Sequence, residues 1–198
     1  HSRFHTTTSQ QSETPFVTEV IDGSHILTVA QSPITHELIL TEGEKPATQA
    51  EQHCGLQQAL ALEALIAQPL ITEDGSEAFI PQMLNMQVTQ GVSFRKGCYT
   101  GQEIVARMQY RGKLKKHLYL FQTDGELRAA PLTAIEDSSG KKVGEVLSCS
   151  TTQGISLIQA VVNNAASTQE LLLKGSRLQP LPLPYPLEPL EDKSGKGQ

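Results

Sequence analysis

The chain has 198 residues, of which 38% are hydrophobic and 19% are charged, and its formal net charge is −5. This size and composition are typical of a soluble globular protein, and no apolar run approaches the ~20 residues that a membrane helix requires. Three widely spaced cysteines without a CxxC pair argue against a disulfide framework and a structural zinc site, and they favour a reducing compartment such as the cytoplasm.

The first part of the chain predicts short strands followed by a helix. Residues 1–15 are polar and rich in Thr, Ser and Gln, so we expect a disordered or disconnected lead-in. Clustered apolar residues between turn signals predict strands over Phe16 to Glu19, His25 to Val29 and His36 to Leu40. The apolar spacing becomes helical over Thr48 to Ala67, and residues 79–95 are then punctuated by Gly and Pro.

The sequence KGCYTGQE, which begins at Lys96, is the stretch that most resembles a chemical site. Thr100 followed three residues later by Glu103 is typical of a capping box, which predicts a helix start at Gly101. Cys98 then lies just ahead of a helix N-terminus. The helix dipole and the charge of Lys96 both favour a thiolate at this position, so Cys98 is a candidate reactive thiol.

A purely structural interpretation of this octet stays open. Most cysteines are small buried hydrophobic residues, and T-x-x-E sequences are common. Glu103 and Arg107, four residues apart, match an ordinary ion pair on a helix surface, which contributes little to stability. His53 beside Cys54 is half of a metal site, but the sequence offers no second half.

Positive charge is concentrated around the octet. Residues 95–117 contain seven basic residues and one acidic residue, a local charge of +6, so the remaining residues carry −11. Such a basic stripe is typical of an anion-binding face or of a solvated helix end. RNA phosphates are one such anion, although the scarcity of aromatic residues near the stripe weakens the case for a stand-alone reader of single-stranded RNA.

After Gly112 the apolar pattern changes to period two. Turn signals separate five strand-like stretches, which are Leu114 to Gln122, Val143 to Cys149, Ile155 to Val162, Glu170 to Leu173 and Arg177 to Leu181. Several short strands at this spacing predict a small antiparallel barrel. The proline-rich stretch from Pro180 to Pro189 favours an extended wrap over that barrel, and residues 191–198 favour a disordered tail.

The octet closely resembles a signature of the YgfZ family of folate-binding, tRNA-modifying proteins. These proteins are relatives of the glycine-cleavage T-protein, an aminomethyltransferase. The sequences FIPQ at residues 79–82 and GVSF at residues 91–94 resemble the same family, as does Arg107. The resemblance runs from about Ile26 to Glu188. Because members of the family carry a further N-terminal stretch, we expect this chain to correspond to their C-terminal part.

The resemblance implies an α+β fold. Residues 16–111 would be the C-terminal part of a T-protein-like folate-binding domain, and residues 112–190 the small antiparallel β-barrel. It implies tetrahydrofolate or a derivative as the cofactor, and no metal ligands. Cys98 and Lys96 would be the reactive thiol and its electrostatic partner, and the cofactor-binding residues are expected to be Tyr99, Gln102, Glu103 and Arg107.

Three positions depart from the family pattern. Ala59 stands where the family commonly has a tryptophan, Leu65 where it has an acidic residue, and Ala67 where it has a glycine. These positions help to define the folate pocket in the family, so we expect weaker or altered folate binding in this chain. The cysteine octet, by contrast, is intact.

The implied function is that of a cytoplasmic, folate-binding accessory protein. It would support the assembly or repair of iron–sulfur enzymes and tRNA modification, in particular methylthiolation. The expected partners are folate and iron–sulfur enzymes such as tRNA methylthiotransferases, with direct tRNA contact as a further option. Two alternatives stay open: a folate-dependent enzyme similar to an aminomethyltransferase, and an RNA-binding module that uses residues 95–117. Against the enzyme, the chain has no carboxylate where the relatives place one.

Overall fold

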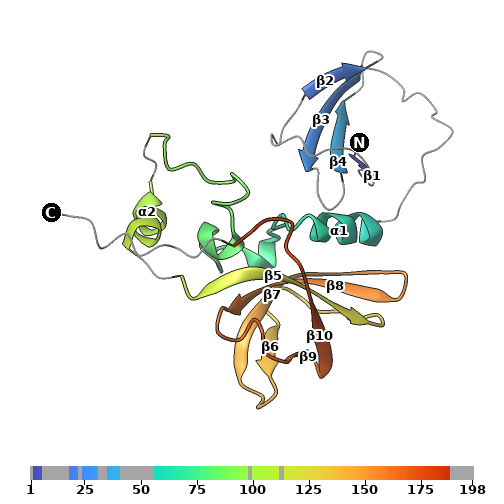
Figure 1. Cartoon of the computed structure of the whole chain (residues 1–198), viewed down its shortest axis with the longest axis vertical. Coiled ribbons are helices and arrows are strands. Elements are labelled where there is room, and N and C mark those ends of the chain that lie inside the picture. Colours follow the sequence, from blue (N-terminus) through green and yellow to red (C-terminus); the bar gives the residue numbers. More distant parts are fainter. Residues whose placement is uncertain are drawn as a thin grey trace.

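The computed structural model of the chain describes residues 2–5, 18–21, 24–30, 35–40, 56–97, 100–111 and 114–187. These residues form an open sheet, a closed barrel, two α-helices and two short 3₁₀ helices (Figure 1). The fold is therefore a mixed α+β fold, as expected. Within the described ranges, no helix combines the length and the apolar composition needed to cross a membrane.

The N-terminal sheet has four antiparallel strands in the order β1-β4-β3-β2. Their bounds are Ser2–His5 (β1), Thr18–Ile21 (β2), Ser24–Ala30 (β3) and Thr35–Leu40 (β4). The three strands predicted in this region are confirmed with shifted ends. The prediction of a disordered lead-in is wrong for the residues of β1. These four residues show no apolar alternation of their own, and they form a strand by pairing with β4.

Six antiparallel strands close into a barrel in the order β10-β5-β8-β7-β6-β9, and β9 pairs back to β10. Their bounds are Lys116–Asp124 (β5), Ala134–Asp137 (β6), Lys142–Thr152 (β7), Ile155–Asn163 (β8), Leu171–Leu173 (β9) and Ser176–Leu181 (β10). The predicted barrel and its five predicted strands are confirmed. The sequence missed β6, which has only four residues and buries only Ile135.

Apolar side chains from all six strands fill the barrel. Phe121 of β5, Val146 of β7 and Ile158 of β8 are almost completely buried and belong to one continuous cluster. Burial of a side chain of this size contributes roughly 1.5–3 kcal/mol relative to its exposed state. The hydrophobic effect therefore favours closure of the barrel over an open sheet, which would leave one edge of this cluster in water.

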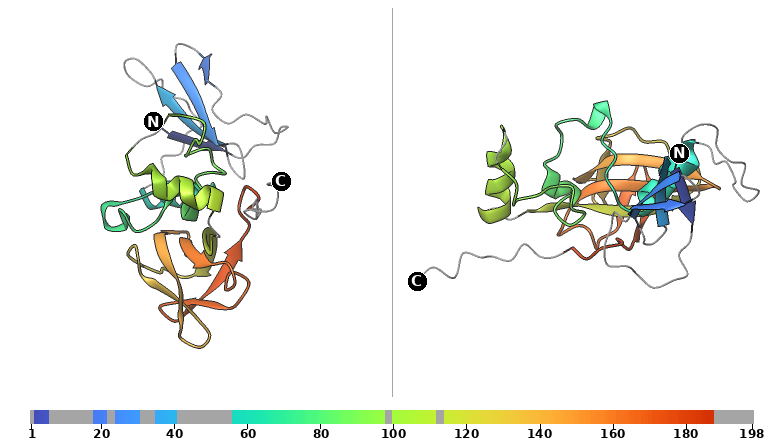
Figure 2. Two further views of the ribbon diagram at one scale, coloured as in Figure 1. Left: turned by 90° about the vertical axis from the view of Figure 1, so that its left-hand side faces the viewer. Right: turned by 90° about the horizontal axis from the view of Figure 1, so that it is seen from above.

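Helix α1, Leu56–Leu65, and the 3₁₀ helix η2, Pro81–Leu84, cover one face of the barrel (Figures 1 and 2). Ala64 of α1 packs in a cluster with Leu157 of β8, and Leu84 of η2 packs in a second cluster with Leu118 of β5. The helix predicted from Thr48 is confirmed from Leu56 onward, and its first part lies outside the described residues. The domain boundary expected between residues 111 and 112 stays a prediction. Each of these two clusters contains side chains from both sides of that boundary.

The stretch that follows β10 returns to the helices that cover the barrel. The hydroxyl of Tyr185 donates a hydrogen bond to the carbonyl oxygen of Ala67 at 3.1 Å, and it accepts one from Asn85 Nδ2 at 3.3 Å. Burial raises the pKa of Tyr185, so this hydroxyl stays protonated and can donate. As far as Leu187, where the description ends, the proline-rich stretch is therefore a wrap anchored by a tyrosine.

We expect Ala67→Gly to raise the free energy of unfolding by about 0.5 kcal/mol. Ala67 follows the C-terminus of α1 with a φ of 52° and is completely buried. This left-handed conformation costs a non-glycine residue about 1–2 kcal/mol, which exceeds the roughly 0.8 kcal/mol gained by burying one methyl group. Urea unfolding measures the change. Ala61→Gly, in the interior of α1, is the control and should lower stability by about 1 kcal/mol or more. Equal losses for the two variants would contradict backbone strain at Ala67.

Candidate functional site

The octet leads from an irregular segment into helix α2, Gln102–Arg111. This helix begins one residue later than predicted, and Gly101 before it has a φ of 86°, which favours glycine. Thr100 therefore lies one residue too early to be the cap that the sequence suggested. Cys98 and Tyr99 lie outside the described residues, so their roles stay predictions. The described residues on both sides of them, Lys96 and Gly97 before and Thr100 and Gly101 after, are exposed.

The other predicted site residues are spread over the surface at the start of α2. Lys96, Glu103 and Arg107 are exposed, and Gln102 is half-buried. The ion pair expected between Glu103 and Arg107 is wrong, since none of the ion pairs between described residues joins them. On a solvated helix face such a pair is worth only about 0.3–0.5 kcal/mol, too little to fix two long side chains. Both residues therefore add charge to the surface without bracing the helix.

A buried glutamine attaches α2 to the segment that precedes it. Gln82 of η2 donates from Nε2 to the carbonyl oxygen of Val105 at 2.6 Å, and Val105 itself is buried against this contact. Phe94 and Tyr110 add an edge-to-face ring contact with centroids 6.2 Å apart. Ile104, by contrast, is an apolar residue of α2 that is 65% exposed. Figure 1 shows α2 beside the start of β5 and well away from α1.

Four buried amide oxygens in η2, α2 and the segment between them accept no hydrogen bond. They are Gln82 Oε1, Asn85 Oδ1, Gln87 Oε1 and Gln109 Oε1. An acceptor buried without a partner costs roughly 1–3 kcal/mol, so each of these atoms favours a bound group that donates a hydrogen bond. In the sequence these side chains carry no signal of their own, except that Gln82 is the last residue of the FIPQ motif.

The basic stripe presents four exposed cations among the described residues, namely Arg95, Lys96, Arg107 and Lys115. His117 belongs to the same stripe in the sequence but is buried, and its Nδ1 lies 2.7 Å from Asn164 Oδ1. Its role is therefore structural. In the described part of the chain, no three His, Cys, Asp or Glu side chains gather as a metal site would require.

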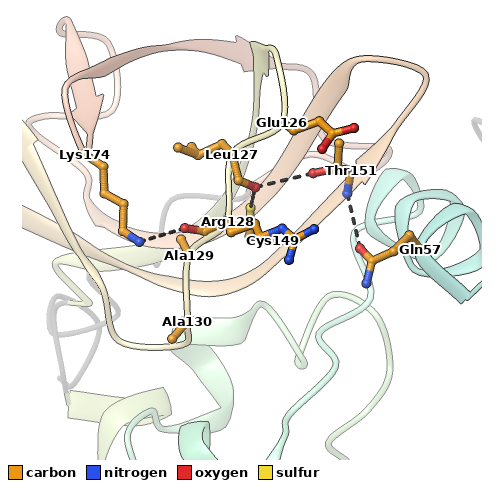
Figure 3. A pocket seen from close by; sticks show the side chains of 9 residues that line it. All are labelled: Gln57, Glu126, Leu127, Arg128, Ala129, Ala130, Cys149, Thr151 and Lys174. Carbon is orange, nitrogen blue, oxygen red and sulfur yellow. Dashed lines mark hydrogen bonds between the residues drawn. The ribbon is translucent and has the colours of Figure 1, made fainter.

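Cys149 of β7 is half-buried in the wall of a cavity of about 610 Å³, shown in Figure 3. Its Sγ donates to the carbonyl oxygen of Leu127 at 3.2 Å. Burial raises the pKa of this thiol, so it remains protonated and is a weak nucleophile. The environment of Cys149 is thus the opposite of the one expected for Cys98.

Comparison with known proteins identifies a relative of the chain. No model of a known protein family matches it. The chain is 36% identical over 188 residues to the tRNA-modifying protein YgfZ of Yersinia enterocolitica, and the match covers 88% of this chain and 56% of that protein. The chain therefore spans about half the length of the curated relative that it matches. The resemblance in the cysteine octet extends to most of the sequence, and the chain belongs to the YgfZ family.

Proposed function

We propose that this chain acts in tRNA modification. The observation that carries the proposal is its identity, across 88% of its length, to a protein named for that activity. The intact octet at residues 96–103 supports the same conclusion, because it combines a cysteine with a cation two residues before it and a helix start four residues after it. The protein would work in the cytoplasm as an accessory factor that supports iron–sulfur enzymes such as tRNA methylthiotransferases.

Tetrahydrofolate or a derivative is the cofactor that we propose. Its pterin ring carries several N–H donors, which suit the unpaired oxygens of Gln82, Asn85, Gln87 and Gln109. Its glutamate tail is anionic and suits the exposed cations of the basic stripe. Folate supplies a carrier of one-carbon units. Leu65, which replaces an acidic residue of the family, packs in an apolar cluster with Leu157 and Leu181, so we expect weaker folate binding than in relatives that keep the acid.

Cys98 is the reactive thiol of this proposal. Helix α2 begins at Gln102, four residues after the cysteine, and Lys96 precedes the cysteine by two residues. Both features lower the free energy of a thiolate relative to a thiol. Gln102, Glu103, Arg107 and Tyr99 would complete the surface at the helix start that contacts the cofactor or the partner enzyme.

We expect Cys98→Ala to abolish the ability of the protein to restore tRNA methylthiolation in cells that lack their own family member. The substitution removes the thiol but leaves the helix start intact. Mass spectrometry of tRNA nucleosides measures the modified fraction, with Cys54→Ala as a control outside the octet. Full rescue by Cys98→Ala would return the octet to a structural role.

Direct contact with tRNA is a second part of the proposal, and the four exposed cations of the stripe favour it. If all four contact phosphates, the logarithm of the affinity should fall with the logarithm of salt concentration with a slope of about −3. Lys115→Gln should reduce the slope by about 0.7. Filter binding or fluorescence anisotropy measures both values. A flat response to salt would remove direct tRNA contact through this surface.

A further inference from the structure

A second cavity, of about 250 Å³, lies between α1, residues 68–74 and the outer face of β7 and β8. Leu60, Leu70, Pro131 and Leu147 supply most of its apolar wall. Its volume is close to the lower end of the range for small-molecule sites, roughly 300–1,000 Å³. Residues of α1 line this cavity and none of α2 does, and Figure 1 shows α1 well away from α2.

Ser150 of β7 gives this apolar cavity an unpaired polar atom. The residue lines the cavity and is only 4% exposed, and its Oγ has no hydrogen-bond partner. The neighbouring polar side chains of the wall are paired, since Ser148 Oγ donates to Gln159 Oε1 at 3.0 Å and Gln159 Nε2 donates to the carbonyl oxygen of Gln68 at 2.9 Å. A buried hydroxyl without a partner costs roughly 1–3 kcal/mol, which a bound polar group would recover.

The charged residues of the cavity are all acidic. Glu63 of α1 and Asp74 of the 3₁₀ helix η1, Glu73–Gly75, line it, and its lining contains no Lys, Arg or His. The adjoining cavity of Figure 3, which shares Ala129 and Cys149 with it, is different because Arg128 and Lys174 line that one. The small cavity therefore favours a cation at its mouth and disfavours phosphates and carboxylates.

We propose that this cavity binds a small primary amine with an apolar body and a hydroxyl group. The apolar body lies against Leu60 and Leu147, the hydroxyl bonds to Ser150 Oγ, and the ammonium faces Glu63 and Asp74. This ligand class excludes folate and tRNA, both of which are anionic. The proposal does not depend on the function proposed above, since it uses none of the octet or the basic stripe.

Three probes of similar size test the proposal: tyramine, phenethylamine, which lacks the hydroxyl, and 3-(4-hydroxyphenyl)propanoate, which replaces the ammonium with a carboxylate. Calorimetry on the full chain should show that tyramine binds about 3–10-fold more tightly than phenethylamine, the range expected for one neutral hydrogen bond. The carboxylate should bind at least about tenfold more weakly than tyramine, because it faces two like charges in a partly desolvated site.

Two variants identify the groups responsible. Ser150→Ala removes a hydroxyl that has no partner in the protein, so the chain should fold normally, and tyramine and phenethylamine should then bind equally. Glu63→Gln should weaken the binding of tyramine and reduce the ratio of its affinity to that of the carboxylate probe. Glu136→Gln changes an exposed carboxylate on β6 outside the cavity and is the matched control.

Cys149 lines both this cavity and the adjoining one, so its alkylation reports binding at either, and the effect of Ser150→Ala assigns that binding to the smaller cavity. In a Cys54→Ser, Cys98→Ser background, saturating tyramine should slow alkylation of Cys149 by iodoacetamide. The proposal would be overturned if tyramine did not bind, or if the amine and the carboxylate bound with equal affinity. It would also be overturned if Ser150→Ala still bound tyramine more tightly than phenethylamine, or if tyramine left the alkylation rate of Cys149 unchanged.

Discussion

Gly144→Ala is expected to lower the free energy of unfolding by about 3 kcal/mol, at the upper end of the usual cost of overpacking. Gly144 of β7 lies opposite Val162 of β8 in the barrel. A Cβ atom at this position would lie 2.8 Å from the carbonyl oxygen of Val161 and 2.8 Å from Cγ2 of Val162. Both valines are completely buried, so neither can move aside without disturbing the β7–β8 pairing.

Gly75→Ala is the control for this clash. An added Cβ at Gly75 would meet only Pro131 Cβ, at 3.9 Å, which is ordinary van der Waals contact. Its effect on stability should stay within about 0.5 kcal/mol. Urea unfolding of both variants measures the difference. If the two alanines cost the same, the close approach of β7 and β8 at Gly144 is not what requires glycine.

Asn85→Ala should lower the free energy of unfolding by a similar amount, about 3 kcal/mol, because one residue supports three separate segments. Asn85 ends η2 with a φ of 59° and is completely buried. Its Nδ2 donates to the carbonyl oxygen of Leu118 in β5 at 2.9 Å and to the hydroxyl of Tyr185. The alanine loses both hydrogen bonds and must also adopt the left-handed conformation, which asparagine tolerates better.

Asn85→Gly separates these two contributions. Glycine accepts the left-handed conformation without strain, so this variant should lose only the hydrogen bonds, about 2 kcal/mol. Tyr185→Phe should cost about 1 kcal/mol, and the double variant should cost less than the sum of the two, because they share one hydrogen bond. Strict additivity would show that Asn85 and Tyr185 act independently.

The barrel was predictable because its strands carry their signal locally. In β5 and β8, strand-like sequence extends over nine residues, long enough to distinguish a strand from a turn. Strands β1 and β6 have four residues each, and their order comes from pairing with β4 and β7. A segment of four residues is too short to show a periodic apolar pattern of its own.

The candidate site was predictable only where it depends on neighbours in the sequence. The octet and the helix after it were found, but the start of α2 shifted by one residue, because Gly101 adopts a left-handed conformation that the capping pattern does not encode. The prediction of an ion pair between Glu103 and Arg107 was wrong, because the small free energy of a pair at this spacing does not exceed the free energy of solvating both side chains separately. Gln82 and Val105 are 23 residues apart, so the contact that holds α2 exists only once the chain has folded.

The seam between β5 and β10 sets the order in which this protein can be completed during synthesis. Strand β5 pairs with β8 on one side and with β10 on the other, and β10 begins 52 residues after β5 ends. Until the ribosome has released β10, β5 presents an open edge that can pair with another chain. The hydrogen bond from Tyr185 to Ala67 spans 118 residues and forms later still. The nascent chain thus passes through a stage with an unpaired edge, at which a chaperone would be most useful.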